Sequence, residues 1–319
     1  MNILITSAGR RVSLLREFKN ELKKTTANGI VFVADANPEY SAASQIANTY
    51  FHLPIVSDDK YVDTLLEIAQ ANNIKVIIPT IDTELQTLAT NRDRFLKEGI
   101  DIIISDLKLI EACRDKRLTQ GLFESISIET PVIYSDSNYR YPVFAKPIDG
   151  SSSKNLYLIQ NKLELAVIQD KNLNLVFMEY LDPAYHTEYT IDIYYDRNST
   201  MKCLVPRKRI EVRSGEVNKA ITEKGDLYNK LESRFAGLSG ARGCITAQVF
   251  VSNDFQEVYG IEVNPRFGGG YPLSYHAGAN YPSWIIQEYL FNRKVQYFKD
   301  WHDNLLMLRY DQEVIVDGN

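Results

Sequence analysis

The sequence predicts a Rossmann-like α/β domain at the N-terminus, followed by an α+β half built on antiparallel sheet. Two observations carry this prediction. Up to about residue 110, short apolar runs alternate with amphipathic segments, which is the pattern of parallel strands covered by helices on both faces. After residue 140, strand-like segments follow one another through short polar turns such as 196–199, and this is typical of antiparallel sheet.

The first half is expected to alternate strands and long helices. Apolar runs predict strands over 2–6, 30–34, 76–79 and 100–104, and near-helical spacing of apolar residues predicts helices over 12–24, 61–72 and 83–94. The strands expected in the second half are 141–147, 155–160, 175–180, 187–195, 201–212, 244–251 and 256–263. The predicted division is a domain over 1–110, a small subdomain over 111–180 and a larger one over 181–319.

Length and composition are those of an ordinary globular protein. The 319 residues suffice for about two domains, and 45% of them are hydrophobic and 24% charged. No apolar run approaches the roughly 20 residues of a membrane helix, and the first residues lack the features of a signal peptide. Three scattered cysteines fit a reducing, cytoplasmic setting. The net charge of −5 argues against a nucleic-acid partner.

The turn after the first strand is a candidate anion-binding site. Ser7-Ala8-Gly9-Arg10-Arg11 follows an apolar strand and opens a helix, and such positions attract anionic ligands. Only Gly9 is present where a nicotinamide site has G-x-G-x-x-G, which disfavours a dinucleotide. A plain structural turn stays open, although the arginines favour contact with a carboxylate or a phosphate.

Three further segments have the residue types of a nucleotide site. Lys146 ends an apolar strand before Pro147, and the small residues that follow, Ser151, Ser152 and Ser153 among them, offer backbone N–H groups and hydroxyls to phosphate. The strand ending at Glu179 leads to an exposed segment that can present backbone groups to a base, and Glu188 can accept ribose hydroxyls. The alternatives are a flexible hairpin loop and a surface salt bridge.

The most specific group is Gln248, Glu262, Asn264 and Arg266. Glu262 and Asn264 are two residues apart on a strand and face the same side. With a hairpin loop over 253–257 and Ser252 opposite Val258, Gln248 lies opposite Glu262. Three oxygen ligands on one sheet face suit Mg²⁺, and Arg266 can stabilise a transferring phosphoryl group. Ordinary polar surface is the alternative.

The ordered set of these segments, from the turn at Ser7 to Arg266, resembles the ATP-grasp superfamily, and within it one ATP-grasp unit of the large subunit of carbamoyl-phosphate synthase. The resemblance implies a pre-ATP-grasp domain followed by two antiparallel-sheet subdomains. It implies nucleotide contacts for Lys116, Lys146, Ser151, Ser152, Ser153, Glu179, Tyr180, Leu181 and Glu188, metal ligation by Gln248, Glu262 and Asn264, and substrate contacts for Gly9, Arg10, Gly268 and Gly269. Lys146 and Arg266 become the catalytic cations. Asn155 departs from the family, which commonly has glycine there.

The activity that the resemblance implies is a carboxylate–amine ligase. ATP and Mg²⁺, with Mn²⁺ as the alternative ion, would phosphorylate a small-molecule carboxylate, and an amine would displace phosphate from the acylphosphate. Positioning and charge neutralisation would be the protein's tasks. A small-molecule kinase that stops at phosphoryl transfer and a non-catalytic nucleotide-binding module are the alternatives. Because relatives are often dimers, a homodimer is the expected assembly.

Overall fold

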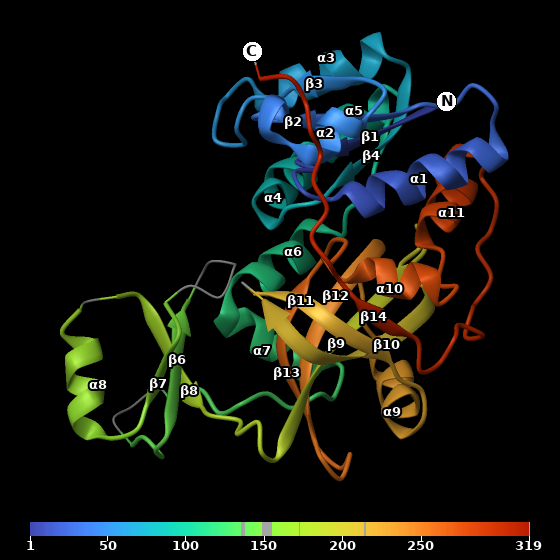
Figure 1. The fold of residues 1–319 in the computed structure, drawn as a ribbon. Coiled ribbons are helices and arrows are strands. Elements are labelled where there is room, and N and C mark those ends of the chain that lie inside the picture. Colours follow the sequence, from blue (N-terminus) through green and yellow to red (C-terminus); the bar gives the residue numbers. More distant parts are fainter. Residues whose placement is uncertain (135–137, 149–154, 172, 214, 319) are drawn as a thin grey trace.

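The N-terminal half is a parallel five-stranded sheet of order β3-β2-β1-β4-β5 (Figure 1). The computed structural model describes residues 1–134, 138–148, 155–171, 173–213 and 215–318. The strands are β1 (Asn2–Thr6), β2 (Val31–Asp35), β3 (Tyr50–His52), β4 (Ile74–Pro79) and β5 (Asp101–Ile102). The helices are α1 (Val12–Thr25), α2 (Ala42–Ile46), α3 (Tyr61–Ala71), α4 (Asp82–Thr90) and α5 (Arg92–Lys97), with a short 3₁₀ turn η1 (Pro38–Tyr40). All registered strand pairs are parallel, which confirms the Rossmann-like prediction.

Strand β1 shows why apolar runs form this sheet. Ile3 and Ile5 lie in one hydrophobic core and Leu4 in the other, and all three are fully buried. Successive side chains of a strand point to opposite faces, so a strand between two helical layers needs apolar residues at every position. The predicted helix 83–94 is two helices, because the chain leaves helical geometry at Asn91.

The second half is dominated by an antiparallel sheet of order β13-β12-β9-β10-β11-β14. Its strands are β9 (His186–Tyr195), β10 (Met201–Arg213), β11 (Glu216–Thr222), β12 (Gly243–Ser252), β13 (Val258–Asn264) and β14 (Leu306–Leu308). The helices of this region are α9 (Asp226–Phe235), α10 (Tyr271–His276), α11 (Tyr281–Ile285) and a π-helical turn η2 (Ile286–Leu290). The antiparallel architecture predicted for this half is thereby confirmed.

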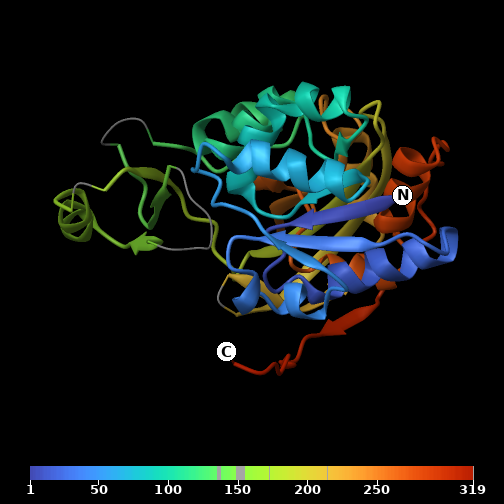
Figure 2. The same ribbon diagram turned by 90° about the horizontal axis from the view of Figure 1, so that it is seen from above.

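A small lobe projects from this body in both ribbon views (Figures 1 and 2). It consists of the antiparallel strands β6 (Val143–Pro147), β7 (Tyr157–Ile159) and β8 (Leu175–Glu179) with helix α8 (Lys162–Gln169). The preceding helices are α6 (Leu107–Arg114) and α7 (Lys116–Ser125). Helix α7 packs on the body, since a Cβ at Gly260 of β13 would lie 2.3 Å from Phe123. The division at residues 110 and 180 stays a prediction, with α7 placed on the larger part.

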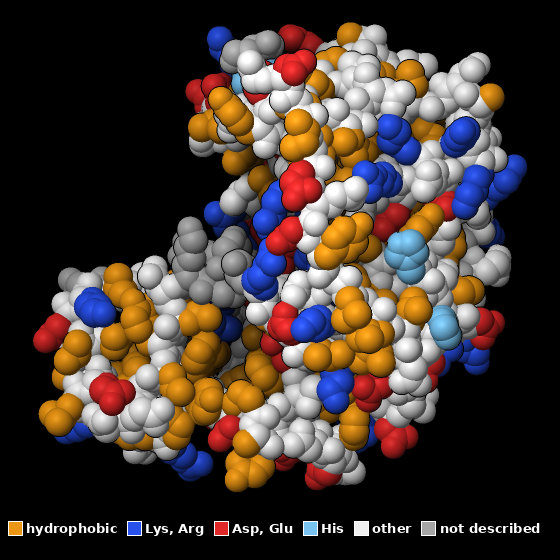
Figure 3. Space-filling view, in the orientation of Figure 1, with side chains coloured by type: hydrophobic (Ala, Val, Ile, Leu, Met, Phe, Trp, Pro, Cys, Tyr) orange, Lys and Arg blue, Asp and Glu red, His pale blue; other side chains and the backbone are white. Residues whose placement is uncertain are grey.

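The three parts enclose a recess in which charged side chains gather (Figure 3). None of the helices in the described ranges has the length and apolar character that a membrane span needs.

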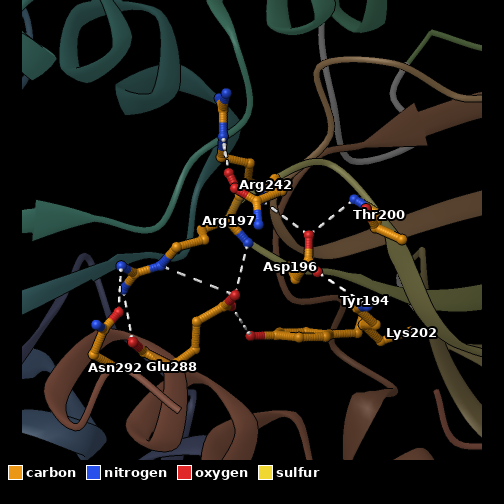
Figure 4. Close-up of polar contacts among 9 residues, drawn as sticks. Tyr194, Asp196, Arg197, Thr200, Lys202, Arg242, Glu288 and Asn292 are labelled. Atoms are coloured by element: carbon orange, nitrogen blue, oxygen red, sulfur yellow. Dashed lines mark hydrogen bonds and ion pairs between the residues drawn. The ribbon is translucent and has the colours of Figure 1, made fainter. Parts of the chain in front are cut away.

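A polar joint fixes the N-terminal domain to the large sheet (Figure 4). In it, Glu288 of η2 accepts hydrogen bonds from the backbone N–H of Arg197 at 3.0 Å and from the Tyr194 hydroxyl at 3.1 Å. Arg242 donates from Nε to the Arg197 carbonyl at 3.0 Å and pairs with Asp106, which precedes α6. These contacts link four segments far apart in sequence, around residues 106, 194–197, 242 and 288, and so tie the N-terminal domain to the large sheet.

Candidate active site

Three oxygen-bearing side chains come together on strands β12 and β13. Gln248 pairs with Glu262 across the strands, and Asn264 follows two residues along on β13. The predicted pairing of Gln248 with Glu262 is confirmed. All three residues are half-buried, and Asn264 donates from Nδ2 to Glu262 Oε1 at 2.9 Å. In the described ranges, no cluster of three His, Cys, Asp or Glu residues forms a metal-ligand group, so a cation here would need further oxygens from a ligand.

The β12–β13 hairpin differs from the predicted one in the residue pairing next to its turn. Val251 lies opposite Val258, where Ser252 was expected. A register shift follows between the pairs Gln248–Glu262 and Val249–Gly260. Such a bulge adds one residue to one strand, here Ile261, and this restores the expected pairing further along.

Arg266 lies where β13 ends and reaches the N-terminal domain. Its Nη2 donates to Asp82 Oδ2 at 2.5 Å and lies 3.3 Å from Asn264 Oδ1. Its Nε is buried and has no hydrogen-bond partner within the described part of the chain. The guanidinium therefore stands beside the candidate metal ligands with one donor unused.

Lys146 faces this group from the small lobe. It lies on β6 and is buried, and burial together with the charge of Lys116 lowers its pKa to about 8, while Glu262 acts in the opposite sense. Lys116 and Lys146 line one small cavity together with Gly260 and Ile261 of β13. Two lysines of neighbouring elements thus share a site with the strand that carries Glu262, and this is an arrangement that favours an anionic ligand.

Glu188 lies on β9 in an ion pair, the alternative that the sequence left open, and its partner is a residue that the sequence did not identify. Arg209 of β10 donates from Nη1 to Glu188 Oε1 at 2.7 Å, and the Nε of Arg209 is buried without a partner among the described residues. Burial raises the pKa of Glu188, the Arg209 charge lowers it, and Glu262 raises it again, with a net rise. Arg207 and Arg209 lie two residues apart on one predicted strand. This basic pattern is the sequence feature that could have pointed to a cationic partner for Glu188.

The predicted adenine segment joins the small lobe to the body. Glu179 ends β8, and its Oε2 accepts the Val132 N–H at 3.2 Å, while Tyr180 and Leu181 lead toward β9. Ser151, Ser152 and Ser153 lie outside the described residues. Asn155, just beyond them, has a φ of 55°. Asparagine tolerates this left-handed conformation better than most residues do, so it can stand where a glycine is common.

The residues predicted to contact substrate lie on two segments, the β1–α1 turn and the loop that follows β13. Gly9 has a φ of 48° and donates its N–H to Asp35 Oδ2 at 3.0 Å. Arg10 is largely exposed, with Nη2 3.6 Å from Glu216 Oε1. Gly268 packs so closely on Thr246 that a Cβ would lie 2.9 Å from its hydroxyl oxygen.

Gly269, the last of the predicted substrate residues, follows at the same turn. A Cβ there would lie 3.2 Å from Arg11 Nη1 and 3.3 Å from the carboxylate carbon of Glu216. The structure thus brings the β1–α1 turn beside the loop that follows β13.

These residues fit a nucleotide with a divalent cation. The buried Nε atoms of Arg209 and Arg266 lack partners in the described structure, and Lys146 is a buried cation beside a second lysine. Unused donors and like charges are costly when buried, and an anion that reaches them removes the cost. The oxygens of Gln248, Glu262 and Asn264 are of the type that Mg²⁺ prefers.

We expect nucleotide affinity to depend on the charge of Lys146. Because the pKa of Lys146 is about 8, its ammonium is charged below this value and neutral above it. Affinity for MgADP, measured by calorimetry, should fall between about pH 7 and about pH 9.5. Lys146→Arg keeps its charge throughout and should remove most of this fall. An equal fall in wild type and variant would place the titrating group elsewhere.

Comparisons with known proteins agree with this geometry. Residues 3–103 match the family model of the PylC-like N-terminal domain, and residues 171–312 match the model of ATP-grasp in the biosynthetic pathway with Ter operon. A D-alanine–D-alanine ligase of Fusobacterium nucleatum is 26% identical over 171 residues. That match covers 48% of this chain and 56% of the ligase, so the chain aligns with little more than half of this relative.

Solved structures share the fold across nearly the whole chain. The biotin carboxylase domain of the Hydrogenobacter thermophilus 2-oxoglutarate carboxylase, solved with MgADP and bicarbonate, superposes with a TM-score of 0.74 at 16% identity, covering 95% of this chain and 73% of that one. An L-amino acid ligase from Bacillus licheniformis superposes with a TM-score of 0.68 at 15% identity, covering 91% and 74%. At these identities the likeness concerns the fold.

Proposed function

Since this chain carries an ATP-grasp domain behind a PylC-like N-terminal domain, we propose that it is an ATP- and Mg²⁺-dependent ligase that joins a small-molecule carboxylate to an amine. One observation carries the proposal. The charge of Glu262 on the large sheet acts on the pKa of Lys146 in the small lobe, and the cavity lined by Lys146 is also lined by Ile261, the neighbour of Glu262. The proposed phosphate-binding Lys146 therefore lies next to the strand that carries two of the proposed metal ligands, Glu262 and Asn264.

Each group has a distinct task in this proposal. Lys116 and Lys146 hold the phosphates, and Gln248, Glu262 and Asn264 hold Mg²⁺, which would neutralise charge on the phosphoryl oxygens. Arg266 stabilises the charge that develops on the transferred group. An oxygen of the substrate carboxylate attacks the γ-phosphorus and ADP leaves. The neutral amine then attacks the acyl carbon, phosphate leaves, and the nitrogen loses a proton to give the amide.

The remaining proposed contacts place the nucleoside. Leu181 offers backbone groups to the base, and Glu188 accepts the ribose hydroxyls once Arg209 turns toward phosphate. Ser151, Ser152 and Ser153 are proposed as further contacts to the phosphates. The resemblance to carbamoyl-phosphate synthase concerns these residue types, and the proposal does not extend to the product of that enzyme.

MgATP binding is the first test. MgATP or MgADP should raise the melting temperature of the wild type, and at 100 times Kd the stabilisation is about 2.7 kcal/mol. Lys146→Ala should weaken binding by roughly 1.5–3 kcal/mol. Lys162→Ala, an exposed lysine on α8 of the same lobe, is the matched control and should bind normally. Absence of a shift in the wild type would contradict the proposed nucleotide site.

ADP release identifies the reaction. Carboxylic acids crossed with amines should give at least one pair for which ADP and phosphate form together with an amide. ADP formation at full rate without any amine would indicate a kinase instead. Nucleotide binding with no release for any acid would indicate a binding module.

A further inference from the structure

A group of guanidinium side chains extends from the proposed phosphoryl-transfer site into the N-terminal domain. Arg266 lies at one end, beside the candidate metal ligands. The charge of Arg266 lowers the pKa of Arg11, which precedes α1, so the two guanidinium groups are near each other. Glu216 is the first residue of β11. Its Oε2 lies 3.0 Å from Nη1 of Arg309, and its Oε1 lies 3.6 Å from Nη2 of Arg10. Four arginines from three separate segments, the β1–α1 turn, the loop after β13 and the C-terminal segment, thus come near one another.

Their positive charges exceed the carboxylates available to them. Arg266 pairs with Asp82 at 2.5 Å, and Glu216 serves both Arg309 and Arg10. Asp311, which also lies nearby, pairs with Arg213 at 2.6 Å and is thereby matched. Four guanidinium groups against Asp82 and Glu216 leave an excess of two positive charges.

Arg11 is the member without a close ion pair, although the charges of Glu216 and Asp82 act on it from further away. It is half-buried, and within the described part of the chain it forms no salt bridge. Its Nη1 lies against Gly269, where a Cβ would come within 3.2 Å of it. Burial, followed by the Arg266 charge, lowers the pKa of Arg11 to about 10. Arg11 is thus a half-buried cation without a close ion pair, next to a glycine that has no side chain. A cation in such a place is positioned to receive an anion.

We propose that the acid taken by this protein carries a second anionic group, a carboxylate or a phosphate, besides the carboxylate that is activated, and that Arg11 and Arg309 bind it. The inference rests on the proposed ligase function, which puts the activated carboxylate at Arg266. The second group then lies toward Arg11 and Arg309, on the side away from the nucleotide. Arg10, exposed at the rim, contributes long-range attraction.

Arginine suits this role for a geometric reason. Its planar fork binds a carboxylate or a phosphate through two parallel hydrogen bonds. Glu216 holds Arg309 in place from the opposite side, and Arg309 also donates to the Val217 carbonyl at 3.1 Å. The side chain of Arg309 is therefore fixed before a ligand arrives, which lowers the entropic cost of binding.

The test compares matched acids on the full chain loaded with MgADP. Succinate is paired with butyrate, glutarate with valerate, and phosphoglycolate with glycolate, and thermal shift gives the concentration at which each acid stabilises the protein. In the wild type, a dianionic acid should act at a concentration at least about tenfold lower than its partner. Preference for phosphoglycolate over the diacids would identify the second group as phosphate, and the reverse as carboxylate.

Variants locate the effect. Arg11→Gln and Arg309→Gln should lose the preference, and Arg11→Lys should keep part of it. Arg16→Gln, the same change at an exposed position of α1, should keep all of it. The shift caused by MgADP should persist in every variant, which shows that they are folded and that the nucleotide site is intact. The inference is overturned if the wild type responds to MgADP but does not prefer any dianionic acid, or if the preference survives Arg11→Gln. A wild type that does not respond to MgADP would overturn the ligase proposal instead.

Discussion

Glu262→Gln is expected to reduce ATP turnover by roughly 10²–10³-fold. The substitution keeps the shape of the side chain and removes the only carboxylate among the three proposed metal ligands on β12 and β13. Neutral oxygens of Gln248 and Asn264 would then hold Mg²⁺ only with the help of the nucleotide phosphates. ADP release at saturating ATP, with an acid and an amine that support turnover, measures the effect.

Gln248→Glu is the matched control for this prediction. It places a carboxylate directly opposite Glu262, so it adds charge to the proposed metal site where Glu262→Gln removes it. This variant should keep measurable activity, with a lower Mg²⁺ requirement. Both positions are half-buried at the surface of the recess, so both proteins should unfold near the wild-type temperature. Normal turnover by Glu262→Gln would show that the metal lies elsewhere.

Asp192→Ala is expected to lower the free energy of unfolding by about 3–5 kcal/mol. Asp192 of β9 and Arg207 of β10 are both fully buried and joined by hydrogen bonds of 2.7 and 3.1 Å. Asp192 also accepts hydrogen bonds from the hydroxyls of Ser274 at 2.6 Å and Thr246 at 3.2 Å. Removing the carboxylate leaves a guanidinium without compensation in the core. Chemical denaturation followed by circular dichroism measures the loss.

Two further variants separate the charge from the contacts. Asp192→Asn keeps most of the packing and should be destabilised less than Asp192→Ala. Asp311→Ala breaks the exposed pair with Arg213 and should leave stability unchanged within error, because exposed pairs contribute little. Equal losses for the buried and the exposed pair would contradict the role given to burial.

The sequence predicted best those features that depend on the residue pattern of a single strand. Apolar runs located β1 and β4 because a strand buried on both faces must be apolar at every position. Glu262 and Asn264 share a face because the period of a strand is two. The bulge at Ile261 was not predictable in this way, since it depends on how the two strands fit each other.

Contacts between remote segments could not be predicted. Arg266 and Asp82 form an ion pair although they are 184 residues apart in the sequence. Arg209 and Glu188 lie on the neighbouring strands β10 and β9, and no local sequence pattern specifies the register of these strands. The edge strand β3 was missed because Tyr50 and His52 are exposed and give no apolar run. Helix α7 was assigned to the small subdomain, and its packing against Gly260 became visible only in the structure.

The central claim, that ATP activates a carboxylate as an acylphosphate before an amine displaces phosphate, has a direct isotopic test. The acid that supports turnover is labelled with oxygen-18 in its carboxylate and incubated with ATP, Mg²⁺ and the amine. Mass spectrometry of the products should find one labelled oxygen in each inorganic phosphate and the other in the amide. Amide formation with unlabelled phosphate would contradict the account, because the carboxylate oxygen would not have attacked the γ-phosphorus.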